Sequence, residues 1–167
     1  MKRKPMMAGN WKMNLTASEG AALVEEILIN ISSVDTSTGD ILVAPPFTTL
    51  HAVSEKVSGS PILLAGQTMH WEENGAFTGE ISPLMLKDAG CTHVILGHSE
   101  RRQYFCETSE TVNKKVHAAF KHGLTPIMCV GESLEERENG KAFDIIGEEM
   151  ETGLQGLTSA QVQSMII

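Results

Sequence analysis

The sequence predicts a parallel α/β fold in which short buried strands alternate with amphipathic helices. Five apolar runs lack hydrophobic/polar alternation, as strands covered on both faces do, and we expect strands at Met6–Asn10, Ile41–Ala44, Pro61–Gly66, His93–Gly97 and Thr125–Gly131. Strand–helix alternation implies right-handed crossovers and a parallel sheet. An open doubly wound sheet and part of a (β/α)8 barrel both satisfy this pattern.

Helices are predicted from capping boxes and from apolar residues spaced three or four apart. Thr16 and Glu19 open a helix whose apolar positions are Leu23, Val24, Ile27, Leu28 and Ile31. A second helix has the apolar face Val112, Val116, Ala119 and Phe120 and is ended by Gly123. A third follows the capping box Ser133–Glu136, with apolar positions Ala142, Phe143, Ile145, Ile146 and Met150. A short helix is expected from Ser159, and Met165–Ile167 resembles the beginning of a sixth strand.

Size and composition indicate a soluble protein with a single domain over residues 1–167. The excess of 21 acidic over 13 basic residues gives a net charge of −8, which argues against nucleic-acid or anionic-membrane partners. Cys91, Cys106 and Cys129 are an odd number without C-x-x-C spacing, so neither a disulfide framework nor a metal site is indicated. No apolar run of signal-peptide or membrane-spanning length occurs, and we expect a cytoplasmic protein.

Polar residues gather after the predicted strands, where parallel α/β folds place their chemistry. These residues are Asn10 and Lys12, Gln67, His98 and Glu100, and Cys129 and Glu132. Several strands therefore contribute to one face. Pattern alone does not choose between the two architectures.

A histidine and two arginines follow the predicted fourth strand. Ser99 suits a helix N-cap, and Glu100 suits the positive end of a helix dipole. Because an imidazole at a helix N-terminus is disfavoured as a cation, we expect a neutral His98 that donates an N–H to a developing oxyanion. The alternative is a structural, hydrogen-bonded histidine. Arg101 and Arg102 do not suit a helix N-terminus, so an acidic group is expected to hold at least one, the alternative being a solvated helix start.

Two other segments carry candidate functional residues. After the first strand, Trp11 follows Asn10 and can fix a loop in which Lys12 is a positive charge for an anionic substrate and Asn10 its hydrogen-bonding partner. The alternative is a solvated lysine. The segment 67–80 is too long for an ordinary βα connection and carries Trp71 and Phe77. It is predicted to be either a self-packed surface loop or an arm that docks into a partner.

Four segments of the chain then resemble one family. They are A-G-N-W-K-M-N (8–14), H-W-E-E-N-G-A-F-T-G-E (70–80), G-H-S-E-R-R (97–102) and P-I-M-C-V-G-E (126–132), and they look like triosephosphate isomerase, collinearly over essentially all 167 residues. The resemblance implies a (β/α)8 barrel, usually a homodimer. It also implies interconversion of dihydroxyacetone phosphate and D-glyceraldehyde 3-phosphate, a glycolytic and gluconeogenic step, without a cofactor.

The resemblance also implies roles for individual residues. Lys12 would stabilise the negative charge of the substrate and the enediolate, and Asn10 would orient both Lys12 and the substrate. His98 would polarise the carbonyl and shuttle protons between its two oxygens. Glu100 would pair with Lys12. Ser99, Cys129 and Arg101 would support the site from behind, Arg101 by anchoring the helix start. The 67–80 arm, with Gln67, Trp71, Phe77 and Thr78, would insert beside the partner's active site, with Thr78 at its tip.

The length of the chain sets a further expectation. A full (β/α)8 barrel takes about 250 residues, whereas these 167 reach five to six β/α units. In the family, the general-base glutamate, the lid loop and the phosphate-binding loops follow the sixth strand. Because a positioned base alone contributes about 10²–10⁴ in rate, we expect the 167 residues by themselves to lack isomerase activity.

Alternatives remain for the assembly and for the function. Three outcomes are open for the unpaired barrel edges. The 167 residues are a fragment of a longer enzyme whose remainder is lost or supplied as a separate complementing C-terminal barrel segment, or they self-associate, or the sheet relaxes toward an open doubly wound shape. A non-catalytic assembly module using the 67–80 arm is the alternative function. A flavodoxin-like phosphate-binding domain would need a Gly-rich or Ser/Thr-rich loop after the first strand, and N-W-K-M-N (10–14) is not one.

Overall fold

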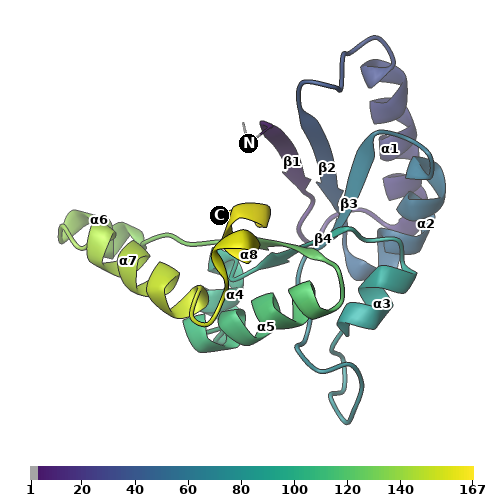
Figure 1. The fold of residues 1–167 in the computed structure, drawn as a ribbon. Helices are drawn as coiled ribbons and strands as arrows, with labels where there is room; N and C mark the ends of the chain where they lie inside the picture. The colour runs from purple at the N-terminus through teal and green to yellow at the C-terminus, as the bar shows by residue number, and fades with distance from the viewer. Residues whose placement is uncertain (1–3) are drawn as a thin grey trace.

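The computed structural model describes residues 4–167 and contains one five-stranded parallel sheet. Its strands are β1 (Met6–Asn10), β2 (Asp40–Ala44), β3 (Ile62–Gly66), β4 (His93–Leu96) and β5 (Thr125–Met128). Strands that are consecutive in the chain are neighbours in the sheet, in the order β1-β2-β3-β4-β5. A doubly wound sheet reverses its strand order part-way, so the open doubly wound alternative is wrong. The sheet is a curled part of a (β/α)8 barrel (Figure 1).

Eight helices connect and flank these strands within residues 4–167. They are α1 (Ala17–Ile31), α2 (Phe47–Val57), α3 (Pro83–Asp88), α4 (Ser99–Phe105), α5 (Ser109–Lys121), α6 (Leu134–Glu138), α7 (Ala142–Gly153) and α8 (Ser159–Ser164). Helices α1 and α2 pack side by side beside β1–β3, and α5 packs against β4, β5 and α7 (Figure 1). None of the helices in the described part of the chain has the length and apolarity needed to cross a membrane.

Both faces of the sheet carry buried apolar residues from β2 to β5, as the lack of alternation predicts, whereas Met7, Ala8 and Gly9 of β1 are exposed and that strand is not covered as predicted. The main core lies between the sheet and the helices and includes Val43 of β2, Leu50 of α2 and Val112 of α5. Alternate residues of the strands form a second cluster on the other face, where Leu42 and Ile95 pack together. The helices are thereby fixed against the sheet, and the loops after the strands are held at one edge.

Several predicted elements are confirmed, with small shifts of their ends. Thr16 is the N-cap of α1 and Ser133 is the N-cap of α6, each within the predicted capping box. Strand β4 ends one residue earlier than predicted because Gly97 has φ +75°, outside the strand region. The sixth strand begins as expected, since Ile166 bridges Ile127 in parallel orientation.

Other parts of the helix prediction are wrong or incomplete. Helices α2 and α3 were not predicted from the sequence. The helix predicted after Ser133 is in fact two helices, separated at Gly140, which has φ +71°. Phe143, expected on the apolar face, is 91% exposed at the start of α7.

Candidate active site

The residues that follow β1, β3 and β4 meet in one pocket of about 220 Å³. Its wall combines cationic, anionic, amide and imidazole side chains with apolar ones, and consists of Asn10, Lys12, Met13, Gln67, Thr68, His98, Glu100, Arg101 and Phe105. Because the strands are parallel, their carboxyl ends share this edge. The structure therefore brings Asn10, Lys12, His98 and Glu100 together from segments far apart in sequence.

The backbone of Lys12 is held from both sides. The Asn10 side-chain oxygen accepts a hydrogen bond from the Lys12 backbone N–H at 3.0 Å. The amide of Gln67 donates to the carbonyls of Lys12 and Ala44, both at 2.8 Å. Lys12 has φ +55°, an uncommon left-handed conformation for a residue with a side chain, and these contacts stabilise it. Gln67, which we assigned to the arm, thus lies at the arm's base and supports the pocket.

The ammonium group of Lys12 contacts the carboxylate of Glu100. Lys12 Nζ donates a hydrogen bond to Glu100 Oε1 at 2.6 Å, and both side chains remain about half exposed. The hydrogen bond from Lys12 lowers the pKa of Glu100 below its ordinary value of 4.5. Glu100 is therefore an anion at neutral pH and fixes the Lys12 charge at the mouth of the pocket.

The imidazole of His98 caps α4. Its Nδ1 accepts a hydrogen bond from the Glu100 backbone N–H at 3.2 Å. A backbone N–H can donate only to an unprotonated ring nitrogen, so this contact leaves the proton of the neutral ring on Nε2. We expected Ser99 to be the N-cap; the cap is His98, and Ser99 is the first residue of the helix. His98 lines both the pocket with Lys12 and a neighbouring one with Cys129.

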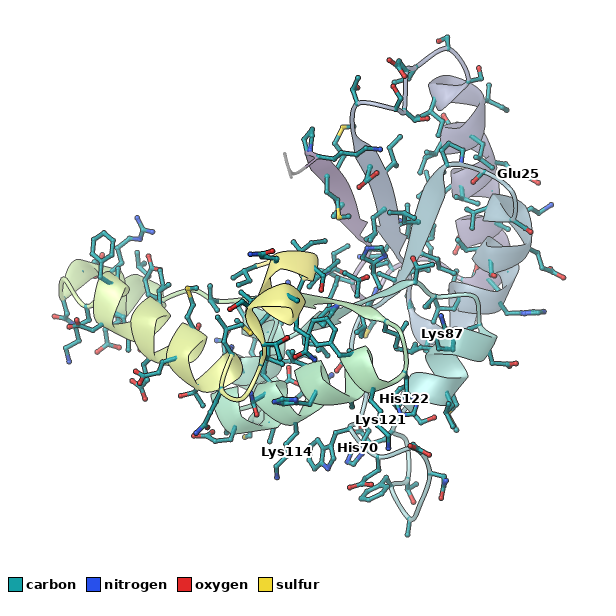
Figure 2. The ribbon with its side chains drawn as sticks, viewed as in Figure 1. Glu25, His70, Lys87, Lys114, Lys121 and His122 are labelled. Atoms are coloured by element: carbon teal, nitrogen blue, oxygen red, sulfur yellow. The ribbon has the colours of Figure 1, made fainter. Side chains whose placement is uncertain are left out.

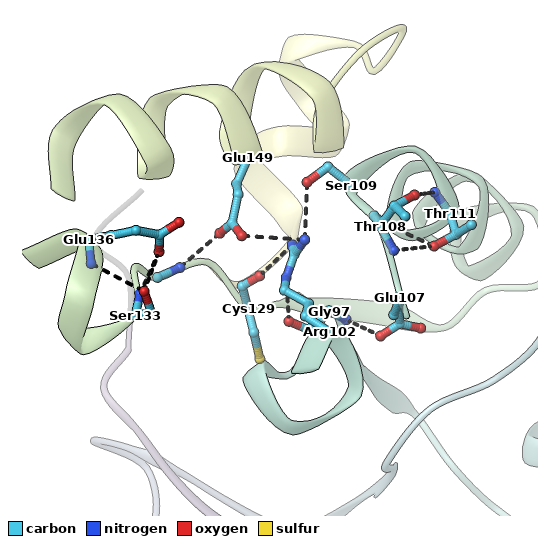
Figure 3. Close-up of polar contacts among 11 residues, drawn as sticks. Gly97, Arg102, Glu107, Thr108, Ser109, Thr111, Cys129, Ser133, Glu136 and Glu149 are labelled. Atoms are coloured by element: carbon cyan, nitrogen blue, oxygen red, sulfur yellow. Dashed lines mark hydrogen bonds and ion pairs between the residues drawn. The ribbon is translucent and has the colours of Figure 1, made fainter. Parts of the chain in front are cut away.

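Both arginines of α4 have acidic partners, where at least one was expected to have one, and the role predicted for Arg101 belongs to Arg102. Arg101 Nε lies 3.7 Å from Glu107 Oε1, and its guanidinium lies over the Phe105 ring. We expected Arg101 to anchor the helix start. The contacts that do so belong to Arg102, whose Nε donates to the Gly97 carbonyl at 2.9 Å (Figure 3).

The sequence did not lead us to predict a buried ion pair between Lys115 and Glu107, near the pocket. Lys115 of α5 donates to Glu107, and both side chains are almost fully buried. The second oxygen of Glu107 accepts from the Gly97 backbone N–H at 3.1 Å (Figure 3). Lys115 also contacts the hydroxyl of Thr68 at 3.4 Å. A lysine on a helix is usually solvated, and only its spacing of three residues from Val112 and four from Ala119 indicates burial.

The residues after β5 lie beside the pocket. Burial raises the pKa of the Cys129 thiol, and the Cys129 carbonyl accepts from Arg102 Nη2 at 3.3 Å. Glu132 accepts a hydrogen bond from Arg137 Nε at 2.6 Å. Glu132 is thereby engaged in its own ion pair, away from Lys12.

The 67–80 segment projects from the body between β3 and α3 (Figure 1). Its aromatic side chains pack on one another, with His70 stacked between Trp71 at 4.1 Å and Phe77 at 4.2 Å between ring centroids. Thr78 is exposed and lines a groove between the segment, α4 and α5. The segment is therefore internally packed and at the same time projects into solvent.

Helix α5 holds the base of this projecting segment (Figure 2). Lys121 Nζ and His122 Nε2 lie 2.6 Å and 3.3 Å from the Glu73 carboxylate. The ammonium of Lys114 lies 5.0 Å from the centre of the Trp71 ring. In residues 4–167 no group of three or more His, Cys, Asp or Glu side chains could hold a metal ion.

Comparisons with known proteins agree with this geometry. The family model described as triosephosphate isomerase matches residues 5–167. The chain belongs to the triosephosphate isomerase family. It is 53% identical over 165 residues to the triosephosphate isomerase of Citrifermentans bemidjiense and 50% identical to that of Thermoanaerobacter pseudethanolicus, covering 99% of this chain in both cases.

The chain spans 65% of the length of each of these triosephosphate isomerases. A crystal structure of triosephosphate isomerase from Bartonella henselae superposes with a TM-score of 0.89 at 40% identity, covering 99% of this chain and 67% of that one. The described strands and helices therefore follow the (β/α)8 barrel of this family over that portion.

Proposed function

We propose that this protein acts as a triosephosphate isomerase, interconverting dihydroxyacetone phosphate and D-glyceraldehyde 3-phosphate by proton transfer through an enediolate. The observation that carries the proposal is the meeting of Lys12, His98 and Glu100 in one pocket. A fixed ammonium and a neutral imidazole N–H are the groups that stabilise a developing oxyanion.

The polar residues Asn10, Lys12, His98 and Glu100 of the pocket have separate roles in this proposed reaction. Lys12 binds the anionic substrate and stabilises the enediolate, and Glu100 holds the Lys12 ammonium at 2.6 Å. His98 donates its Nε2 proton to the substrate oxygens, and its Nδ1 is committed to the Glu100 backbone N–H. Asn10 fixes the loop that carries Lys12 and orients the substrate. Ser99, Cys129 and Arg101 support these groups from neighbouring positions.

The carbon-bound proton requires a carboxylate base. Among the described residues Glu100 is the one carboxylate that lines the pocket, and Lys12 keeps it anionic and engaged. We therefore propose that residues 1–167 supply the electrophilic half of the site and that the base comes from polypeptide outside them. The share of the related isomerases that the chain spans, 65%, is consistent with this division.

The protein is further proposed to be cytoplasmic and to work as a homodimer, or with a complementing C-terminal barrel segment. Three side chains at or near the pocket support an interface, because Met13, Phe77 and Phe105 are 95%, 43% and 65% exposed. In this assembly the 67–80 arm, with Thr78 at its tip, inserts beside the partner's Asn10 and Lys12. The same exposed groups favour the second candidate function, a non-catalytic assembly module that uses the arm.

A chimaera tests the catalytic proposal. Residues 1–167 replace the matching part of the C. bemidjiense isomerase, and conversion of glyceraldehyde 3-phosphate is measured in a coupled assay beside residues 1–167 alone. We expect turnover in the chimaera and none in the shorter chain. Lys12→Met and His98→Gln are expected to abolish or strongly reduce turnover, whereas Lys56→Gln, in an exposed ion pair with Glu25, preserves it.

Two results would contradict the proposal. A folded chimaera without turnover would remove the catalytic role and leave the assembly module. Robust turnover by residues 1–167 alone, on material of verified mass, would show that the base lies within them.

A further inference from the structure

The peptide group between Gly97 and His98 is held by a guanidinium at the junction of β4 and α4. Arg102 Nε donates to the Gly97 carbonyl at 2.9 Å. On the other side of Gly97, its own N–H donates to the buried Glu107 carboxylate at 3.1 Å. Because a peptide group is planar, fixing the Gly97 oxygen also fixes the direction of the following N–Cα bond of His98. The two charges therefore set the orientation from which the imidazole projects.

The same guanidinium reaches the end of the next strand. Arg102 Nη2 donates to the Cys129 carbonyl at 3.3 Å, and Nη1 donates to the Ser109 hydroxyl at 3.0 Å. The planar fork of arginine satisfies these acceptors in three directions at once, which a lysine ammonium at the end of a flexible stem does not. Arg102 thus bridges Gly97 and Cys129, the residues that directly follow β4 and β5 (Figure 3).

Glu149 of α7 completes this arrangement. Its Oε1 lies 3.4 Å from Arg102 Nη1, and its Oε2 accepts from the Gly131 backbone N–H at 2.9 Å. The Arg102 and Glu149 side chains are only 18% and 13% exposed, so solvent screens the pair weakly. Gly97 permits the close approach, because a Cβ there would lie 3.0 Å from Arg102 Nη2.

We propose that Arg102, held by Glu149, is a positioning residue for His98. The pair acts through the Gly97 carbonyl and keeps the His98 ring in the tautomer that presents Nε2–H to the pocket. The proposal rests on the proposed function in one respect, that His98 is the group whose placement matters for catalysis. Neither side chain lines the pocket that holds Lys12, so the effect on His98 is indirect.

The experiment compares the 167-residue chain with its Arg102→Lys and Glu149→Gln variants by ¹⁵N NMR. The ring-nitrogen signals of His98 are assigned by their loss in His98→Gln. In the unsubstituted chain we expect separate signals of an unprotonated Nδ1 and a protonated Nε2. Arg102→Lys should move the two signals toward each other and raise amide hydrogen exchange at Glu100 about tenfold, the scale of one lost charged hydrogen bond. Glu149→Gln should act in the same direction and less strongly, because Arg102 keeps its carbonyl acceptors.

The matched control is Lys56→Gln, which removes an ion pair between α1 and α2 and should leave the His98 signals unchanged. Unchanged His98 signals in Arg102→Lys would overturn the proposal. So would exchange that rises equally at all amides of β4 and β5, since that indicates general loosening. If Arg102→Lys does not give a dispersed spectrum, Glu149→Gln decides, and unchanged His98 signals in it would overturn the proposal.

The ring-nitrogen readout needs no turnover, which separates this proposal from the catalytic one. An inactive chimaera would remove the isomerase function and leave the tautomer result intact. In an active chimaera, Arg102→Lys should lower kcat about tenfold or more with little change in KM, because Lys12 and Asn10 are untouched. Equally large changes in kcat and KM, or no change in either, would count against a positioning role for Arg102.

Discussion

The ammonium of Lys12 lies 2.6 Å from the carboxylate of Glu100, a residue 88 positions later in the chain. The contact joins the loop after β1 to the first turn of α4 across the mouth of the pocket. Both residues stand at the carboxyl ends of parallel strands, and the curl of the sheet brings these ends within reach of each other. The positive charge proposed to bind substrate is thereby held in place before any ligand arrives.

This contact gives a pH dependence with a defined direction. Lys12 holds the pKa of Glu100 below 4.5. The contribution of the Lys12–Glu100 contact to the stability of the fold is therefore complete above pH 4.5 and is lost as the pH falls through the depressed pKa. A ¹³C NMR titration of the Glu100 carboxyl group should show this low midpoint. In Lys12→Met the midpoint should rise toward 4.5; a midpoint that stays where it was would mean that Lys12 is not the cause.

Replacing the buried Lys115 by methionine should cost about 3–5 kcal/mol of unfolding free energy. The substitution removes the hydrogen-bonded cationic partner of Glu107 and leaves its carboxylate, in a nearly water-free site, to the longer contact with Arg101 Nε at 3.7 Å. Urea denaturation measures the loss. The matched control is the neighbouring Lys114, which is exposed and lies over Trp71; Lys114→Met should cost about 1 kcal/mol or less. Equal losses for the two lysines would contradict the assignment.

Two helical glycines should respond to alanine in opposite directions. A Cβ on Gly20 of α1 would lie 2.4 Å from Thr49 Cγ2 and 3.0 Å from the Trp11 ring, so Gly20→Ala should destabilise the fold by about 1–3 kcal/mol. Gly147 of α7 has open space around the same position. Gly147→Ala should stabilise by about 0.5–1 kcal/mol through helix propensity. Thermal or urea unfolding of both variants distinguishes them, and a stabilised Gly20→Ala would refute the close packing of α1 on α2.

The three cysteines should differ in reactivity. Burial raises the pKa of the Cys91 thiol to about 12 and also raises that of Cys129, whereas Cys106 is exposed. Since the thiolate is the reactive form, iodoacetamide at pH 8 should modify Cys106 first and leave Cys91 unmodified in the folded protein. Peptide mass spectrometry gives the order, and urea should remove the difference. Early modification of Cys91 would indicate that its core position is wrong.

Local sequence signals predicted the strands and the capped helices, because each depends on residues that are neighbours in the chain. Thr16 and Ser133 cap helices as expected. Helix α3 carries an equally local signal that was overlooked, with Ser82 as N-cap and Pro83 at the first helical position. Helix α2 begins after Pro46, whose side chain has no hydrogen-bonding atom to cap the helix. The formation of α2 therefore depends on its packing against α1, which no local signal shows.

The candidate site was less predictable, since its contacts join residues far apart in sequence. The resemblance to the isomerase family implied the pairing of Lys12 with Glu100, whereas spacing alone could not. The anchoring contacts were assigned to Arg101 and belong to Arg102, because adjacent residues on a helix point about 100° apart and only the surrounding strands determine which one turns inward. Arg102 turns toward the Gly97 carbonyl, and Arg101 turns toward Glu107.

The strand order β1-β2-β3-β4-β5 also bears on how the chain folds as it leaves the ribosome. Each of the strands β2 to β5 pairs with the strand synthesised immediately before it, so its docking edge already exists when it emerges. Growth of the sheet can therefore follow synthesis from the N-terminus, one β/α unit at a time, without waiting for a distant segment to return. The pocket would form progressively along the same path, with Lys12 in place first and His98 and Glu100 added once β4 joins the sheet.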